Sequence, residues 1–370
     1  MNQERYPITR LLAIALIFLL WQLIDVSPTS GQGDTGPVPP PPPTWEDAPR
    51  PSEQAQNKLL ASTNSAGCSA SAHCNFLPVI SYTKDPAAEA MEIYRRLYIP
   101  SQNPYIGWSG NANACYPGET SAAFLTAMKQ RINYFREMAG VPPITTLSST
   151  YNTMGQAAAL MMSANGKLSH SPTSDWTCYT ELGKTGAGKS NLFLGMFGPE
   201  AIDGYIRDPG EGNTAAGHRR WILHPPTTTM GTGDIPNGGQ WAANSLYVFD
   251  ASIWAPRPAT RDPFVAWPPP GYVPYNTVYP RWSFAVPSAD FAGSTVTVKQ
   301  GSTVIPVTKF TQVNNYGENT LVWQIASMTD WEYWPKPTGD VSYTVTITNV
   351  IVNAVSKNYS YTVTVFDPAR

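Results

Sequence analysis

The chain has 370 residues, 42% of them hydrophobic, so it is long enough for two domains with well-formed cores and is not intrinsically disordered. Its formal net charge is -2 and its 24 Lys and Arg residues are scattered, which argues against a nucleic-acid partner. The 36 Pro, 12 Trp and 19 Tyr, with only 14% charged residues, are typical of loop-rich proteins that act outside the cytoplasm.

Residues 1–30 have the features of an export signal. Arg5 and Arg10 precede an apolar run at 11–24, as in the charged and hydrophobic regions of a signal peptide. The run is short for a membrane span, which needs about 20 residues as a helix. Small residues follow at 27–31 without a clear cleavage site, so a cleaved signal peptide and an uncleaved signal anchor both stay open. In either case we expect an extracellular or cell-surface protein, in the second case with an N-terminal membrane tether.

Residues 31–85 are predicted to be a disordered linker, because their proline run favours extended polyproline II and cannot bury a core. The four cysteines are an even number, which an oxidising compartment tends to pair. Cys68 and Cys74 are close enough for a local loop. That choice leaves Cys115 with Cys178, and other pairings stay open.

Residues 86–254 are expected to form the first domain. Apolar residues recur every three or four positions from Leu125 to Met138, which predicts a helix capped by Thr120 or Ser121 and stopped at Gly140. Further helices are predicted at 148–166, 199–207 and 213–223, and strands at 229–235 and 245–250.

After a Pro-rich joint at 255–272, residues 273–370 change to short alternating strands. They are predicted at 281–286, 294–300, 302–310, 321–326, 342–350 and 359–367. Tyr343, Val345 and Ile347 should share the buried face. This pattern is typical of an immunoglobulin-like β-sandwich.

Residues 183–190 read GKTGAGKS, which satisfies the phosphate-binding pattern G-x-x-x-x-G-K-[ST]. The hydrophobic run LYVFD at 246–250 imitates the strand whose Asp would hold magnesium. However, a phosphate-binding helix would have to continue through Gly195, Gly198 and Pro199, and the preceding segment is not a Val/Ile-rich strand. We therefore expect a glycine-rich loop and no nucleotide cofactor.

Only four histidines exist, and His170 and His218 stand in distinctive contexts, KLSHSP and AAGHRRWILHPP. Their spacing is no local metal motif, so their convergence depends on the fold. Arg219 and Arg220 beside His218 could bind an anion or complete internal contacts.

These two motifs, with SNLFLG between them and MGTGD after them, resemble in order and spacing the CAP superfamily. This is the SCP-like domain of cysteine-rich secretory proteins, antigen 5 and plant pathogenesis-related proteins, and the bacterial branch is most similar. The resemblance covers residues 115–254 and implies an α-β-α sandwich. The expected fold class is thus α+β, a CAP-type sandwich followed by the all-β domain.

The resemblance also implies a cleft in which two histidines and two acidic residues can hold zinc or another divalent cation. His170 and His218 match the histidines, and Asp208 matches one acidic position. Ser190 stands where the second glutamate is usual, and a hydroxyl is a poor zinc ligand. Glu181 is a possible stand-in, and His170, Asp208 and His218 could alternatively form a three-ligand open site.

We therefore expect a binding protein with a lipid, cell-wall or host-surface ligand, since CAP proteins have been linked to such ligands. The alternative is a metal-dependent extracellular hydrolase or peptidase that uses the two-histidine cleft. A third hypothesis is an adhesin in which both domains are recognition surfaces.

Overall fold

The structure, a computed structural model, describes residues 85–238 and 240–370. The expected export signal, nearly all of the linker and the Cys68–Cys74 loop lie outside these ranges. Within them, no helix is both long and apolar enough to cross a bilayer.

Six α-helices lie in the first half of the described chain. They are α3 (Pro86–Ile93), α4 (Ala122–Met138), α5 (Ser149–Asn165), α6 (Glu181–Ala187), α7 (Pro199–Arg207) and α8 (Gly217–Ile222). The first of three sheets has the order β1-β3-β4-β2, with β1 (Thr146–Leu147), β2 (Ser190–Leu194), β3 (Thr229–Ile235) and β4 (Ala243–Tyr247).

Local capping rules account for the two long helices. Ser121 caps α4, since its Oγ accepts a hydrogen bond from the N–H of Phe124 at 3.1 Å. Gly166 ends α5 in the left-handed conformation, with φ of 60°. The helix predicted at 213–223 is shorter than expected, because Ala216 also adopts a left-handed φ, of 50°, directly before α8.

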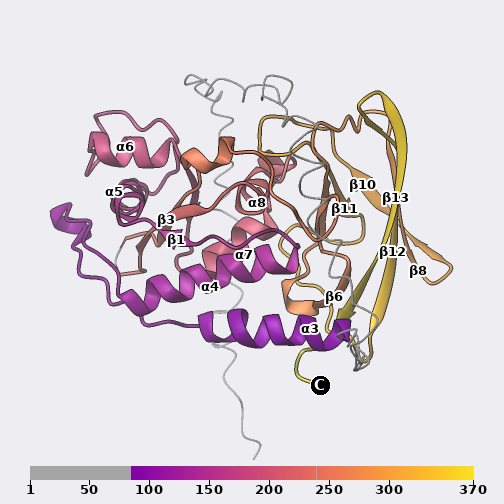
Figure 1. Ribbon diagram of the computed structural model, residues 1–370. Helices are drawn as coiled ribbons and strands as arrows, with labels where there is room; N and C mark the ends of the chain where they lie inside the picture. Colours follow the sequence, from indigo (N-terminus) through magenta and orange to yellow (C-terminus); the bar gives the residue numbers. More distant parts are fainter. Residues whose placement is uncertain (1–84, 239) are drawn as a thin grey trace, which may run out of the picture. The chain divides into compact units, whose positions relative to one another are not determined.

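The first sheet lies between two layers of helices, with β1 and β3 between α5 and α6 on one side and α4 and α7 on the other (Figure 1). Strand β2 shows the alternation that this requires. Leu192 packs in a cluster with residues of α5, whereas Phe193 packs against Tyr205 of α7, with ring centroids 5.7 Å apart. This part of the chain is therefore a three-layer α-β-α arrangement.

Glycines let α5 approach this sheet closely. A Cβ built on Gly233 of β3 would lie 2.0 Å from the backbone N of Gln156 and from the backbone C of Gly155. The Gln156 side chain then bonds the strand directly, because Nε2 donates to Asp234 O at 2.8 Å and Oε1 accepts from Asp234 N at 2.9 Å. The MGTGD sequence is thus the surface on which α5 rests.

The disulfide between Cys115 and Cys178 is present, with 5.0 Å between the Cα atoms. This pair was one of the pairings considered from sequence. It closes a loop that contains α4 and α5.

The C-terminal region consists of two sheets. One has the order β10-β11-β7-β5 and the other β6-β13-β12-β8-β9. Their strands are β5 (Val265–Trp267), β6 (Gly271–Pro274), β7 (Arg281–Ala285), β8 (Thr295–Gln300), β9 (Thr303–Ile305), β10 (Val307–Lys309), β11 (Thr320–Ile325), β12 (Val341–Val352) and β13 (Val355–Phe366).

Aromatic side chains join these two sheets. Val345 and Ile347 are fully buried, and Tyr343 meets Trp282 of the opposite sheet edge to face at 6.0 Å, as their common face predicts. The single strand expected at 302–310 is wrong. Pro306 divides it, so that β9 pairs with β8 in one sheet and β10 pairs with β11 in the other.

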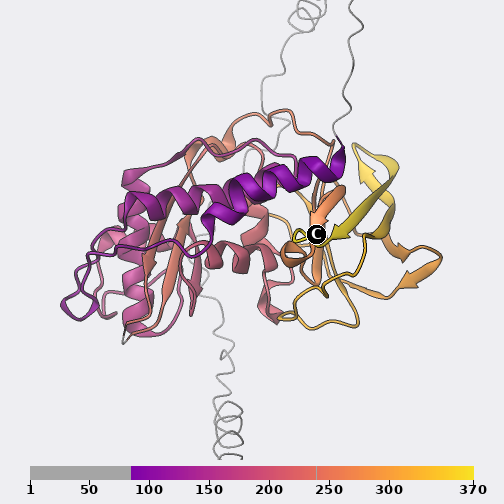
Figure 2. The ribbon, with the colours of Figure 1, turned by 90° about the horizontal axis from the view of Figure 1, so that it is seen from below.

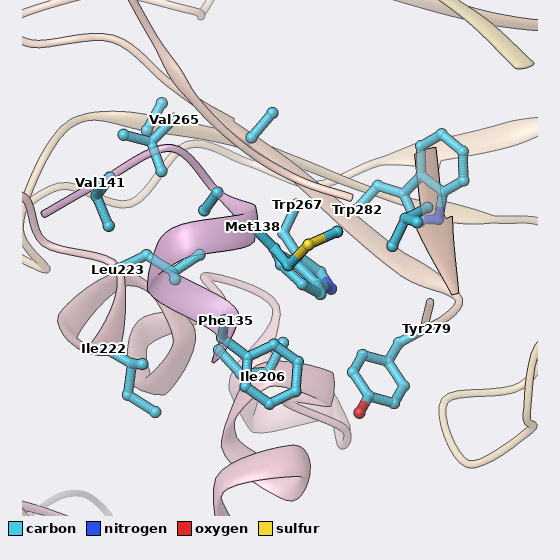
Figure 3. Packing of buried hydrophobic residues seen from close by; sticks show 14 of the residues in the cluster. Phe135, Met138, Val141, Ile206, Ile222, Leu223, Val265, Trp267, Tyr279 and Trp282 are labelled. Carbon is cyan, nitrogen blue, oxygen red and sulfur yellow. The ribbon is translucent and has the colours of Figure 1, made fainter. Parts of the chain in front are cut away.

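One hydrophobic core runs from the helices into the C-terminal sheets (Figure 3). Phe135 of α4 meets Trp267 of β5 edge to face, with centroids 5.0 Å apart, and both side chains are fully buried. Strand β5 lies within the segment expected to be a joint. Helices α3 and α4 follow one another along one side, where α3 contacts β6 (Figure 2).

Candidate functional site

His218 and Asp208 form a buried pair at the start of α8. The imidazole Nδ1–H donates to Asp208 Oδ1 at 2.7 Å, and the His218 side chain keeps 25% of its surface exposed while that of Asp208 has none. Desolvation acts to lower the pKa of His218, but the charge of Asp208 and its hydrogen bond outweigh it, so the pKa is raised. In its neutral form His218 is thus held as the Nδ1–H tautomer, with Nε2 as its remaining nitrogen.

The second carboxylate oxygen of Asp208 is also engaged. Oδ2 accepts hydrogen bonds from the backbone N–H groups of His218 at 3.0 Å and Arg219 at 3.4 Å. These are orphan donors of the first turn of α8, which no side chain of Ala216 caps. Asp208 itself ends α7 in a left-handed conformation, with φ of 53°. The carboxylate therefore joins the end of one helix to the start of the next.

Arg281 of β7 anchors Asp208 from the C-terminal region. Its Nη1 donates to the main-chain O of Asp208 and to that of Asn213, the latter at 2.8 Å. Its Nη2 pairs with Asp330 at 3.1 Å. Arg219 reciprocates, since its Nη2 donates to Arg281 O at 2.8 Å and its Nη1 to Ser283 Oγ at 3.0 Å. The backbone that carries the His–Asp pair thus rests on the C-terminal sheet.

The two arginines beside His218 consequently face the protein interior. Arg219 is fully buried, and burial lowers its pKa to about 9. Arg220 donates to the main-chain oxygens of Val313 at 2.7 Å and Glu318 at 3.0 Å. The sequence left open whether these arginines bind an anion or make internal contacts, and the structure shows internal contacts.

Two further residues hold the His218 ring and backbone. The ring of Tyr205 from α7 stacks on the imidazole, with centroids 5.4 Å apart, and its O–H donates to Asn244 Oδ1 at 2.8 Å. The Asn191 amide, in the SNLFLG motif, donates to His218 O at 3.0 Å. The asparagine of that motif is therefore a positioning residue for the histidine motif.

His170 lies in the loop that follows α5, close enough to His218 for the two charges to interact. Its Nδ1–H donates to Ala187 O at 2.9 Å, which again leaves Nε2 as the remaining nitrogen. Desolvation by the surrounding protein lowers the pKa of His170, and the charge of His218 lowers it further, while the Ala187 contact acts in the opposite direction. His170 is therefore neutral near pH 7.

The other two residues considered for the metal site, Ser190 and Glu181, hydrogen-bond to other residues. Ser190 is buried, and its Oγ donates to Gly186 O at 2.7 Å. Glu181 lies on the exposed start of α6 and accepts a hydrogen bond from the Tyr179 O–H at 2.6 Å. Among the described residues, neither side chain hydrogen-bonds to His170 or His218.

These contacts decide how well the site fits a metal. Imidazoles whose Nδ1–H is held by a carboxylate or carbonyl oxygen are the usual form of metal-ligating histidine. However, structural and catalytic zinc sites use three or four protein ligands. In the described part of the chain, no group of three or more His, Cys, Asp or Glu side chains could hold a metal ion. Two imidazoles alone do not fit a resident catalytic zinc.

The GKTGAGKS segment has the wrong order of elements for a phosphate loop, because helix α6 comes before the lysine–serine pair and strand β2 begins at Ser190. The loop expected there is wrong over 183–187, which is helical. A Cβ on Gly186 would lie 2.3 Å from Met154 O of α5, and one on Gly183 would lie 2.8 Å from Met161 Cε. These glycines allow α6 to pack directly on α5.

Sequence reasoning did not single out Tyr205 or Arg281. Tyr205 lies within a predicted helix, where its apolar spacing resembles that of a core residue. Arg281 is separated from Asp208 by 73 positions and lies in another region, so no local signal connects them.

Residues 129–250 match the family model described as CAP, the cysteine-rich secretory protein family. A search of curated proteins finds no match to this chain. The family match spans the segment that contains the His–Asp pair, Tyr205 and His170. It supports the assignment of residues 129–250 to the CAP superfamily.

Proposed function

We propose that the chain is a secreted or surface-tethered CAP-domain protein of the bacterial branch that binds a lipid, cell-wall or host-surface ligand rather than turning over a substrate. The C-terminal region, which we interpret as an immunoglobulin-like sandwich, is the support on which the cleft is built. Exposure to an oxidising compartment agrees with the Cys115–Cys178 disulfide.

The observation that carries this proposal is the engagement of Asp208, the acidic residue expected beside the two histidines. Asp208 accepts three hydrogen bonds and has no exposed side-chain surface. Ser190 and Glu181 bond elsewhere. A general base must reach the proton that it abstracts, directly or through one water. Within the described residues, the two histidines therefore have one unbonded imidazole nitrogen each for binding, and the carboxylate beside them is already engaged.

A divalent cation such as zinc is part of the proposal only as a reversible ligand. The Nε2 atoms of His170 and His218 are the two donors that would hold it, and water would have to supply the others. Two protein ligands predict that the cation is lost on gel filtration. The alternative hydrolase requires a cation that is retained.

The test uses the full chain with insoluble cell walls and, separately, with phospholipid vesicles. Sedimentation measures the bound fraction, and mass spectrometry measures released fragments. We expect binding without release, and no more than substoichiometric zinc after gel filtration. Release of wall fragments or peptides that disappears in the His170→Ala, His218→Ala double variant would establish the hydrolase instead.

A further inference from the structure

A groove lies where the end of α5 meets the segment before β4, and neither His170 nor His218 lines it. It is a groove of about 660 Å³, lined by residues 163–166, Gly195, Asn237 and residues 240–242. Small-molecule sites have volumes of about 300 to 1,000 Å³. The groove is therefore large enough for a ligand of one or two rings.

The groove does not include the contacts of His218. Asn191, which contacts His218, lies at the start of β2, whereas Gly195 follows the end of that strand. Four residues of extended chain separate the two points by about 13 Å. A ligand of one or two rings in the groove therefore has its own contacts.

Trp241 is the main aromatic surface of the groove, and its position is fixed by its neighbours. The residue is 59% exposed, yet its main-chain O accepts a hydrogen bond from buried Ser163 Oγ at 2.6 Å. The indole lies against Gly166, where an added Cβ would come within 2.7 Å of Nε1. An exposed ring held in this way needs little ordering when a ligand binds.

The remaining lining of the groove is polar and uncharged. None of the described residues that line it is Asp, Glu, Lys, Arg or His, which disfavours an ionic ligand. Gln240 donates from Nε2 to Asn113 Oδ1 at 3.0 Å, but its Oε1 is buried without a hydrogen-bond partner among the described residues. A buried acceptor without a hydrogen-bond partner is destabilising. A rotation of this side chain that exposes the oxygen to the groove would let a ligand O–H satisfy it.

We propose that this groove binds a neutral saccharide, with one pyranose ring lying on the Trp241 indole and its hydroxyls meeting the amides of Asn237 and Gln240. A β-linked pyranose with equatorial substituents presents a flat C–H face and a rim of hydroxyls. This shape matches an amphipathic aromatic ring beside amides that both donate and accept. The ligand class is thus a β-1,4-linked oligomer of glucose or N-acetylglucosamine.

This inference deepens the proposed function by naming one ligand class, and it rests on that function in taking the ligand to be met outside the cell. It does not involve His170 or His218. The two proposals can therefore fail separately.

The test is calorimetric titration of the full chain with cellotriose and with chitotriose. We expect at least one to bind, and Trp241→Ala to weaken that binding by about tenfold or more. Gly166→Asn keeps a residue that tolerates positive φ but displaces the indole, so it should weaken binding with the fold intact by circular dichroism. The control Trp331→Ala, at a tryptophan that is 54% exposed outside the groove, should leave affinity unchanged.

Four outcomes would overturn the proposal that the groove binds a saccharide. Neither trisaccharide binds, or Trp241→Ala binds as well as the wild type, or Trp331→Ala weakens binding as much as Trp241→Ala. Loss of binding in the His170→Ala, His218→Ala variant alone would assign the sugar to the cleft. That result would remove the groove proposal and leave the proposed function standing.

Discussion

Asp208 shows how one side chain can serve several neighbours at once. Its carboxylate fixes the tautomer of His218, accepts from two backbone N–H groups of α8, and is itself excluded from solvent. A carboxylate in this position cannot also be a free metal ligand. Its contribution to the cleft is the charge state and orientation of His218.

We predict that Asp208→Asn lowers the pKa of His218 below that in the wild type, because only desolvation then acts strongly on the ring. Since the wild-type pKa is raised, the pair stabilises the fold fully below about pH 6.5, and this contribution is lost as pH rises through the folded value. NMR titration of the histidine ring protons measures the shift. The control is Asp340→Asn, whose carboxylate pairs with Arg370; an equal shift there would contradict the prediction.

The pKa of His224 is shifted in the opposite direction to that of His218, and so its effect on stability has the opposite pH dependence. Burial lowers its pKa to about 4, while Nε2–H donates to Ile253 O at 3.1 Å. In the unfolded chain His224 therefore becomes protonated below about pH 6.5, whereas in the folded chain it becomes protonated only below about pH 4. Between pH 7 and 4.5 this costs the wild type about 2 kcal/mol.

His224→Gln keeps a donor for Ile253 and removes the titration. We expect its free energy of unfolding, measured in urea, to fall by about 2 kcal/mol less than that of the wild type between pH 7 and 4.5. Parallel losses in the two proteins would show that His224 does not titrate as its burial implies.

At the scale of elements, some glycines are required because two elements approach each other so closely that a Cβ would not fit between them. The α5 helix rests on β3 through Gly233, and α6 rests on α5 through Gly183 and Gly186. In each case backbone or a packed side chain lies where a Cβ would be. The segment that resembles a phosphate loop is therefore explained by helix packing.

Gly233→Ala tests this packing. The added methyl would meet backbone atoms that cannot move independently, so we expect a loss of about 2 to 3 kcal/mol in the free energy of unfolding. Gly293→Ala is the matched control, because nothing lies within 4 Å of a Cβ there. Urea denaturation of both variants gives the comparison; equal stabilities would mean that α5 can shift at little cost.

The helices also show which parts of the fold the sequence could predict and which it could not. Helices α4, α5 and α7 follow from apolar spacing and from caps such as Ser121 and Gly166, which act over a few residues. The sequence predicts a loop in place of α6, because glycine disfavours helices locally, whereas in the fold the packing of α6 on α5 requires glycine. The histidine motifs pointed to the cleft, but the occupation of Asp208 depends on contacts that only the folded chain brings together.

For the molecule as a whole, the described helices and the C-terminal sheets share one core. Trp267 of β5 is fully buried against Phe135 of α4, and Arg219 and Arg281 bond across the same boundary. Neither region could separate without exposing large aromatic side chains and buried arginines. The two should unfold together.

We therefore predict one calorimetric transition for residues 85–370 in the full chain, with equal calorimetric and van't Hoff enthalpies. Trp267→Ala should lower stability by about 3 to 5 kcal/mol and keep a single transition at lower temperature. Trp254→Ala, at a tryptophan that is 47% exposed, should change little. Two resolved transitions in either protein would show that the regions unfold independently.

Arg281 connects the C-terminal sheet to the turn before α8. Arg281 lies on β7, and its guanidinium group donates hydrogen bonds to the main-chain oxygens of Asp208 and Asn213. These two residues lie on either side of the turn that leads into α8. A displacement of the C-terminal sheet would therefore act on this turn, which carries Asp208 and leads to His218. A ligand bound to the sheet and one bound at His218 would therefore be coupled through the buried guanidinium groups of Arg281, Arg219 and Arg220.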